Sequence, residues 1–228
     1  TLRFTSPMVT GRTRHFAVIG ENTFLRPTRL AAERPRLLRS EVRTEAGYDM
    51  VILHTEPMAA AAEALQTHRS MGLAGHPNPR VATVDLQDVY DQFGHGVKEP
   101  AALRNYLKFL DVTDPRLEFV VLMGDASRDY RNRAGRDEQG PEIDRCPTYV
   151  QTHWPADPLN AGSVPYAYDG WLVSFDDPPV TSNVNVDLPD LAVGRLPASN
   201  LAEATHLVRR VIDYETRPAG GVWRNRAL

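Results

Sequence analysis

The stretch Phe119-Val120-Val121-Leu122-Met123-Gly124-Asp125 gives the clearest indication of the fold. Its apolar run, which begins at Leu117, has the length and the β-branched content of a buried strand in a parallel sheet. The Gly-Asp pair then ends the strand. Three further runs of the same kind are candidate strands: Met50–His54, Val81–Asp85 and Leu191–Gly194.

Helical patterns lie between these runs. Pro57 suits the first turn of a helix, and an alanine-rich segment with helical spacing follows it as far as Met71. Pro100 begins a second helix, and Ser199-Asn200 predicts the cap of a third that continues to Tyr214. Two segments are expected to be irregular or extended: Asp88–Gly96 as a loop and Tyr166–Phe175 as a strand or hairpin arm.

The alternation of strands and helices predicts an α/β fold with a mostly parallel four-stranded sheet flanked by helices, of a Rossmann-like kind. Ligands of such sheets gather beyond the carboxyl ends of the strands, where Asp85 and Gly124-Asp125 fall. Residues 1–47 are Arg-rich and irregular, and we interpret them as a lead-in segment, with the end of a preceding domain as an alternative. Residues 48–228 are expected to form the α/β unit.

Composition excludes several classes of protein. The 228 residues carry 26 Lys and Arg against 29 Asp and Glu, a formal charge of −3, which argues against nucleic acid as the main partner. No run approaches the roughly 18 apolar residues of a membrane helix. The single cysteine, Cys146, rules out an internal disulfide and a cysteine-rich zinc site. The chain begins at Thr1 rather than Met, and we therefore expect it to be processed, with any targeting signal removed.

A local catalytic dyad is one hypothesis for the chemistry. Gly94-His95-Gly96 offers an imidazole base, and Cys146 offers a thiol that such a base could activate. However, Pro147 follows the cysteine and has no N–H to contribute to an oxyanion hole. The plainer interpretation is a turn histidine and an incidental thiol.

Acidic residues gather in the second half of the chain, and oxygen ligands on loops suit calcium. The alternative is that they are solvated loop carboxylates. Gly124-Asp125 after a buried strand could also hold magnesium for phosphoryl transfer, but no Walker-type phosphate-binding motif accompanies it. These residues are Asp125, Asp129, Asp169, Asp176, Asp177, Asp187 and Asp190.

Several segments, in this order and spacing, resemble the first half of the gingipain-type cysteine peptidases, a family that includes the sortase of the type IX secretion system. The resemblance covers about residues 47–228, and its most specific part is Asp190-Leu191-Ala192-Val193-Gly194-Arg195-Leu196-Pro197, closed one helix later by Tyr214-Glu215. The other segments are Tyr48–His54, Leu65–Leu73, Val84–Phe93, Phe119–Asp125 and Val211–Glu215.

The resemblance implies a caspase-like fold of two side-by-side α/β subdomains, with the catalytic histidine and cysteine in the second. This chain would then be the non-catalytic first subdomain of a secreted or cell-surface cysteine endopeptidase. Its partners would be the catalytic subdomain of the same protein and a polypeptide substrate. Neither His95 nor Cys146 falls at a catalytic position of the family pattern. The alternatives are a stand-alone binding or scaffold module and a component of the secretion-system sortase.

The resemblance also implies a calcium site. The family pattern places a ligand at the Gly-Asp after the third strand and others before the Gly-Arg strand, which correspond to Asp125, Asp187 and Asp190. For these carboxylates to meet, the start of the last strand must approach the end of the Phe119–Met123 strand. The site therefore requires a hairpin or antiparallel neighbour at this position.

Overall fold

The computed structural model describes residues 47–127, 129–130, 145–151, 166–175, 188–217 and 220–221. All of them belong to one unit of the chain, Pro35–Leu228. The lead-in predicted for residues 1–47 lies outside the described residues except for Gly47, so its boundary stays a prediction.

A four-stranded parallel sheet forms the centre of the described structure. Its strands lie in the order β2 (Val81–Asp85), β1 (Met50–His54), β3 (Phe119–Met123) and β6 (Ala192–Leu196). All three neighbouring pairs are parallel, including β3 with β6. The predicted α/β sheet is confirmed, but the antiparallel neighbour that the calcium prediction required is wrong.

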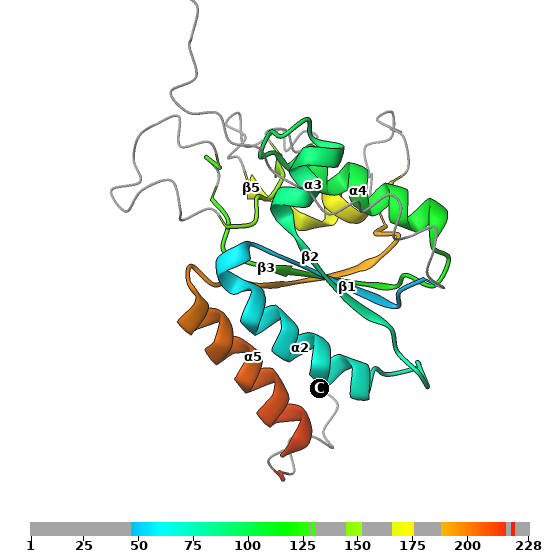
Figure 1. Cartoon of the computed structure of the whole chain (residues 1–228), viewed down its shortest axis with the longest axis vertical. Coiled ribbons are helices and arrows are strands. Elements are labelled where there is room, and N and C mark those ends of the chain that lie inside the picture. The colour runs from blue at the N-terminus through cyan, green and yellow to red at the C-terminus, as the bar shows by residue number, and fades with distance from the viewer. Residues whose placement is uncertain are drawn as a thin grey trace, which may run out of the picture. The chain divides into compact units, whose positions relative to one another are not determined.

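Helices cover both faces of this sheet (Figure 1). α2 (Ala59–Met71) and α5 (Leu201–Thr216) lie on one face, and α3 (Leu86–Phe93) and α4 (Pro100–Thr113) lie on the other. The predicted helices after Pro57, from Pro100 and after Asn200 are confirmed. Pro57 itself lies in a short 3-10 turn, Glu56–Met58, and the Asn200 side chain caps α5 by accepting a hydrogen bond from the Glu203 amide.

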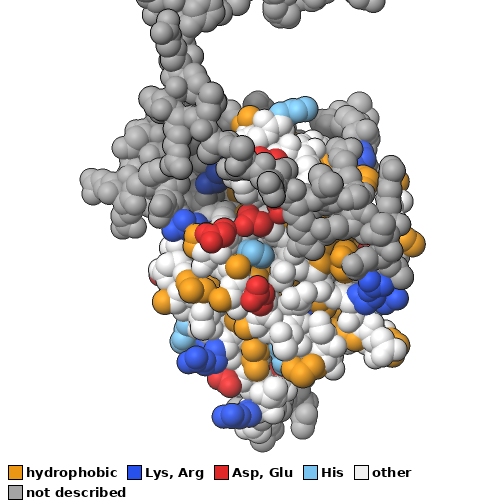
Figure 2. All heavy atoms as spheres, in the orientation of Figure 1, with side chains coloured by type: hydrophobic (Ala, Val, Ile, Leu, Met, Phe, Trp, Pro, Cys, Tyr) orange, Lys and Arg blue, Asp and Glu red, His pale blue; other side chains and the backbone are white. Residues whose placement is uncertain are grey.

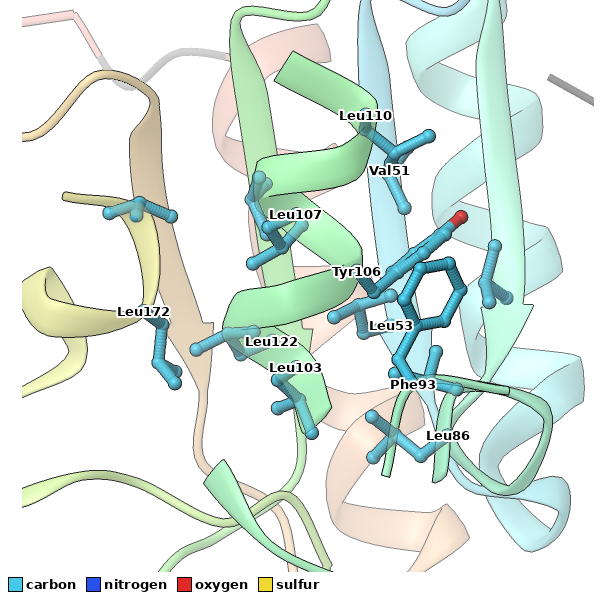
Figure 3. Packing of buried hydrophobic residues seen from close by; sticks show 14 of the residues in the cluster. Val51, Leu53, Leu86, Phe93, Leu103, Tyr106, Leu107, Leu110, Leu122 and Leu172 are labelled. Atoms are coloured by element: carbon cyan, nitrogen blue, oxygen red, sulfur yellow. The ribbon is translucent and has the colours of Figure 1, made fainter. Parts of the chain in front are cut away.

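Alternation along the strands divides the buried side chains between two cores. Val51 and Leu53 point to the larger core, under α3 and α4, while Met50 and Ile52 point to the smaller one, under α2 and α5. Figure 3 shows how the leucines of α4 fill the larger core. Residues of α4 there include Leu103, Tyr106, Leu107 and Leu110.

Helix α3 corrects the loop predicted for Asp88–Gly96. Its buried residues fall at helical spacing, and the Asp85 carboxylate caps the helix by accepting from the Gln87 amide at 2.8 Å. Strand β2 continues directly into this helix, so no Gly or Pro marks its beginning. Only the segment Gly94–Gly96 is a turn, and His95 there has a φ of 54°. The buried residues are Leu86, Val89, Tyr90 and Phe93.

The prediction of a strand or hairpin arm for Tyr166–Phe175 is correct only at its start. β5 (Tyr166–Ala167) pairs antiparallel with β4 (Val150–Gln151). The chain then turns into a 3-10 helix, η3 (Asp169–Val173), which packs against α4. Arg104 of α4 holds this turn, because its guanidinium donates to the carbonyls of Trp171 and Ser174.

The two edges of the sheet differ. At the β2 edge, the Gln66 side-chain amide donates to the outward carbonyl of Val81 at 2.7 Å. At the β6 edge, Ala192 N–H donates to Glu118 and Leu196 carbonyl accepts from Gly124. Because alternate residues of a parallel strand face each neighbour, the backbone groups of Val193 and Arg195 point away from β3. Among the described residues, no strand pairs with this outer side of β6, although η3 packs against the strand.

Candidate functional site at the carboxyl ends of the strands

Three loops meet where β3 ends. The Asp125 N–H donates to the Ala198 carbonyl at 2.9 Å, and the Asp125 carbonyl accepts from the amides of Arg145 and Cys146. Gly124 makes this approach possible, since its φ is 144° and a Cβ there would lie 2.6 Å from the Arg145 Cβ. The Gly-Asp pair therefore joins the ends of β3 and β6 to the Arg145–Cys146 segment.

Arg195 of β6 is the centre of this junction. Its Nη1 donates to the carbonyl of Gly124 at 2.8 Å and to the carbonyl of Cys146 at 2.7 Å. Its Nε and Nη2 form a two-bond ion pair with Asp169, at 2.8 and 2.7 Å. Thr148 donates a further hydrogen bond to the same carboxylate at 2.7 Å. One side chain thus connects four separate segments of the chain.

The charges of this pair depend on each other. Burial alone would lower the pKa of Arg195, but its hydrogen bonds to Asp169 and its electrostatic interactions with the Cys146 side chain and the Asp169 carboxylate raise it instead. Burial would likewise raise the pKa of Asp169, but Arg195 and Thr148 together hold that pKa below the ordinary value. Both groups therefore stay ionised at neutral pH, and the arrangement is suited to holding loops together.

The residues of the hypothetical dyad lie in different surroundings. Cys146 is fully buried in the larger core, beside the Arg195 guanidinium. His95 is exposed in the turn after α3 and lines a cleft of about 470 Å³ between α3 and α4, together with Lys108 and Phe109. Cys146 does not line that cleft. The described structure therefore does not assemble a thiol and an imidazole at an open site.

The predicted calcium ligands are also separated. Because β6 runs parallel to β3, Asp190 precedes β6 at the amino end of the sheet, whereas Asp125 follows β3 at the carboxyl end. The Asp125 carboxylate accepts from the Ala126 amide, and the Asp190 carboxylate accepts from the Phe175 amide. Asp187 lies outside the described residues.

These two carboxylates do not fit one shared calcium ion. Asp190 instead lies near Asp111, whose pKa is raised by burial and by the Asp190 charge. Within the described ranges, no group of three or more His, Cys, Asp or Glu side chains could hold a metal ion. In the same ranges, no helix is both long and apolar enough to cross a membrane.

Arg195 and Asp169 are the site residues that sequence reasoning missed. Arg195 stood inside the most specific motif, yet nothing in the sequence names its partners, which lie 26 to 71 residues away. Asp169 was counted among the loop carboxylates without a role. The signal available was a charged residue within an otherwise apolar strand, since such a residue needs a buried partner.

The described fold is similar to that of a solved structure. The crystal structure of dimeric latent PorU from Porphyromonas gingivalis is similar, with a TM-score of 0.64 and 23% identity over 82% of this chain and 17% of that chain. That likeness defines the class of fold, a caspase-like α/β protein. A search of curated proteins finds no match.

The family is shown by a second comparison. The model of peptidase family C25, the gingipain family, matches residues 43–228, so the chain belongs to that family. The resemblance drawn from the motifs is thereby confirmed. The chain spans only 17% of the PorU chain in that structure.

Proposed function

We propose that this chain is the non-catalytic first α/β subdomain of a gingipain-like cysteine endopeptidase that is secreted or exposed at the cell surface. In this role it packs beside a catalytic subdomain and forms one wall of the groove that receives a polypeptide substrate. Membership of the C25 family supports peptide-bond hydrolysis as the activity of the whole protein. Nucleophile and base would come from the other subdomain.

The interior of the described domain supports a structural role. Cys146 is fully buried beside Arg195. The hydrogen bonds of Arg195 at the carboxyl ends of the strands join loops to one another rather than facing a cleft. Active sites need a nucleophile within reach of a base and of substrate. The described residues do not provide that combination, because Cys146 and His95 lie apart.

The unpaired outer side of β6, the border strand of the described sheet, is the observation that carries the proposal. Val193 and Arg195 direct backbone donors and acceptors away from the sheet, and Ala192 and Gly194 are exposed on the face that carries α2 and α5. Phe119 of β3 is only half-buried on that same face. Figure 2 shows apolar side chains interspersed with charged ones over the region of α2 and α5. Open edges are usually protected or paired.

The test is to express residues 1–228 and the remainder of the same reading frame as two separately tagged polypeptides and to purify them together. We expect a complex with peptidase activity that iodoacetamide blocks and that Cys146→Ala leaves intact. Val193→Pro should abolish the complex, because proline removes the outward N–H of the edge while keeping an apolar side chain. Val112→Asp, on the exposed surface of α4, is the matched control and should leave the complex unchanged.

Two results would contradict the proposal. A folded chain that neither binds the remainder nor gains activity from it would favour the scaffold module, the alternative from another class. Peptidase activity of the 228-residue chain alone, lost in Cys146→Ala, would instead establish local catalysis. The sortase role is separated from general proteolysis by substrate: a sortase joins the cleaved peptide to an amine acceptor, whereas an endopeptidase releases it to water.

A further inference from the structure

His76 lies in a tight turn between α2 and β2. Its amide donates to the Leu73 carbonyl at 3.0 Å, and Gly75 supports the turn with a φ of 81°. The imidazole is largely buried, with 14% of its side chain exposed. The ring also packs against Phe119 in a T-shaped arrangement, with the ring centres 5.7 Å apart. The turn therefore holds this ring against the amino ends of β1 and β3.

Two carboxylates flank the ring, one at each nitrogen. Nδ1 lies 3.0 Å from Oδ1 of Asp49, which precedes β1, and Nε2 lies 3.2 Å from Oε2 of Glu118, which precedes β3. A carboxylate can only accept a hydrogen bond, and a neutral imidazole carries a single N–H. Only the doubly protonated ring can donate to both partners at once.

The other partners of Asp49 keep that carboxylate ionised. Arg116 binds both oxygens of Asp49, and the Arg80 amide donates to one of them. Burial would raise the pKa of Asp49, but these hydrogen bonds hold that pKa below its ordinary value. Asp49 is therefore ionised throughout the range in which histidines usually titrate. Glu118 is largely exposed, and the structure pairs its carboxylate with His76.

We propose that His76 is a proton-operated clasp between the turn after α2 and the amino ends of β1 and β3. When the ring takes up a proton from solvent, it donates to Asp49 and Glu118 together and fixes the turn Leu73–His76. When the ring loses that proton, it can donate to one carboxylate only, and the exposed Glu118 is released. Mildly acidic conditions thus tighten this end of the domain. The inference does not depend on the proposed function.

A double-mutant cycle on the full chain tests the clasp. Unfolding equilibria are measured in urea at pH 6 and pH 8 for the wild type, His76→Gln, Glu118→Gln and the double variant. At pH 6 we expect a coupling between the two positions of about threefold in the unfolding constant, the size of a partly exposed ion pair. At pH 8 that coupling should be lost. Since only the doubly protonated ring can donate to both carboxylates, the stability that this contact adds should fall as the pH rises.

His206→Gln is the matched control, because His206 is exposed on α5 and distant in sequence from this cluster. We expect its effect to be equal at both pH values. A His76–Glu118 coupling of the same size at pH 6 and pH 8, or no coupling at pH 6, would overturn the proposal. Because the cycle compares variants with each other, a general loss of stability in any one of them does not affect the result.

Discussion

Each end of the sheet holds a carboxylate bound to an arginine. The more deeply buried member of the pair is the carboxylate at the amino end and the arginine at the carboxyl end. At the amino end, the Asp49 side chain is 2% exposed and that of Arg116 is 46% exposed. At the carboxyl end, the Arg195 side chain is 14% exposed and that of Asp169 is 27% exposed. A buried charge without a partner is costly. Substitution of the less buried partner, Arg116 at the amino end or Asp169 at the carboxyl end, therefore leaves a buried charge without its counter-ion.

The ends also differ in the support that remains after such a loss. Asp49 keeps hydrogen bonds from the Arg80 amide and from His76 when Arg116 is removed. When Asp169 is removed, Arg195 loses its carboxylate partner and keeps the backbone carbonyls of Gly124 and Cys146, which carry no full negative charge, together with the Cys146 side chain beside it. The carboxyl end should consequently be the more sensitive of the two.

Asp169→Ala should have the largest effect, a destabilisation of about 3 kcal/mol, because it leaves the Arg195 cation largely buried without a counter-charge. Arg116→Met should cost less, since Asp49 retains its other donors. The measurement is urea unfolding of both variants beside the wild type. The double variant Asp169→Ala/Arg195→Met should recover part of the loss, and failure to recover any would show that the ion pair is not its cause.

Gly124→Ala should come next, at about 2 kcal/mol, because alanine is strained at a φ of 144° and its Cβ would meet the Arg145 Cβ. Gly194→Ala provides the matched control on the neighbouring strand. A Cβ at Gly194 meets no atom within 4 Å, so that change should stay within about 0.5 kcal/mol. Thermal unfolding of the two variants gives the comparison, and equal losses would contradict the geometry of the junction.

Lowering the pH should reduce the stability of the folded domain gradually, and by less than the substitutions above. The pKa values of Asp49 and Asp169 are lowered in the folded state, and Arg69 and His68 likewise lower that of Glu215 against the effect of burial. The stability that these groups contribute is present above their ordinary pKa of about 4 and is lost as the pH falls through the lower folded values. Urea midpoints between pH 5 and pH 2.5 should therefore decrease, and less steeply in Asp169→Asn. An unchanged slope would exclude this pair as a source.

Much of the fold could be predicted because it depends on local patterns. The strand at Phe119–Met123 and the helix capped by Asn200 follow from apolar spacing and from capping chemistry. α3 was mistaken for a loop although Leu86, Val89 and Tyr90 show the correct spacing. The reason is that the strand continues into the helix through Asp85, whose side chain is the cap rather than a sign of a loop.

The candidate site was less predictable because it depends on long-range contacts. The direction of β6 decides whether Asp125 and Asp190 meet, and strand direction is not a local property. The ion pair of Arg195 with Asp169 arises only when η3 packs beside the sheet. Motif resemblance identified the family correctly, but it could not supply this arrangement.

The Gln66 amide on Val81 has a consequence for self-association. Because the Gln66 side chain already occupies the outward carbonyl of Val81 in β2, copies of the domain at high concentration should meet by preference through the opposite border, β6. Two copies joined there by a two-fold axis leave no free border for a third. Any self-assembly of this kind should stop at pairs and should not continue into fibres.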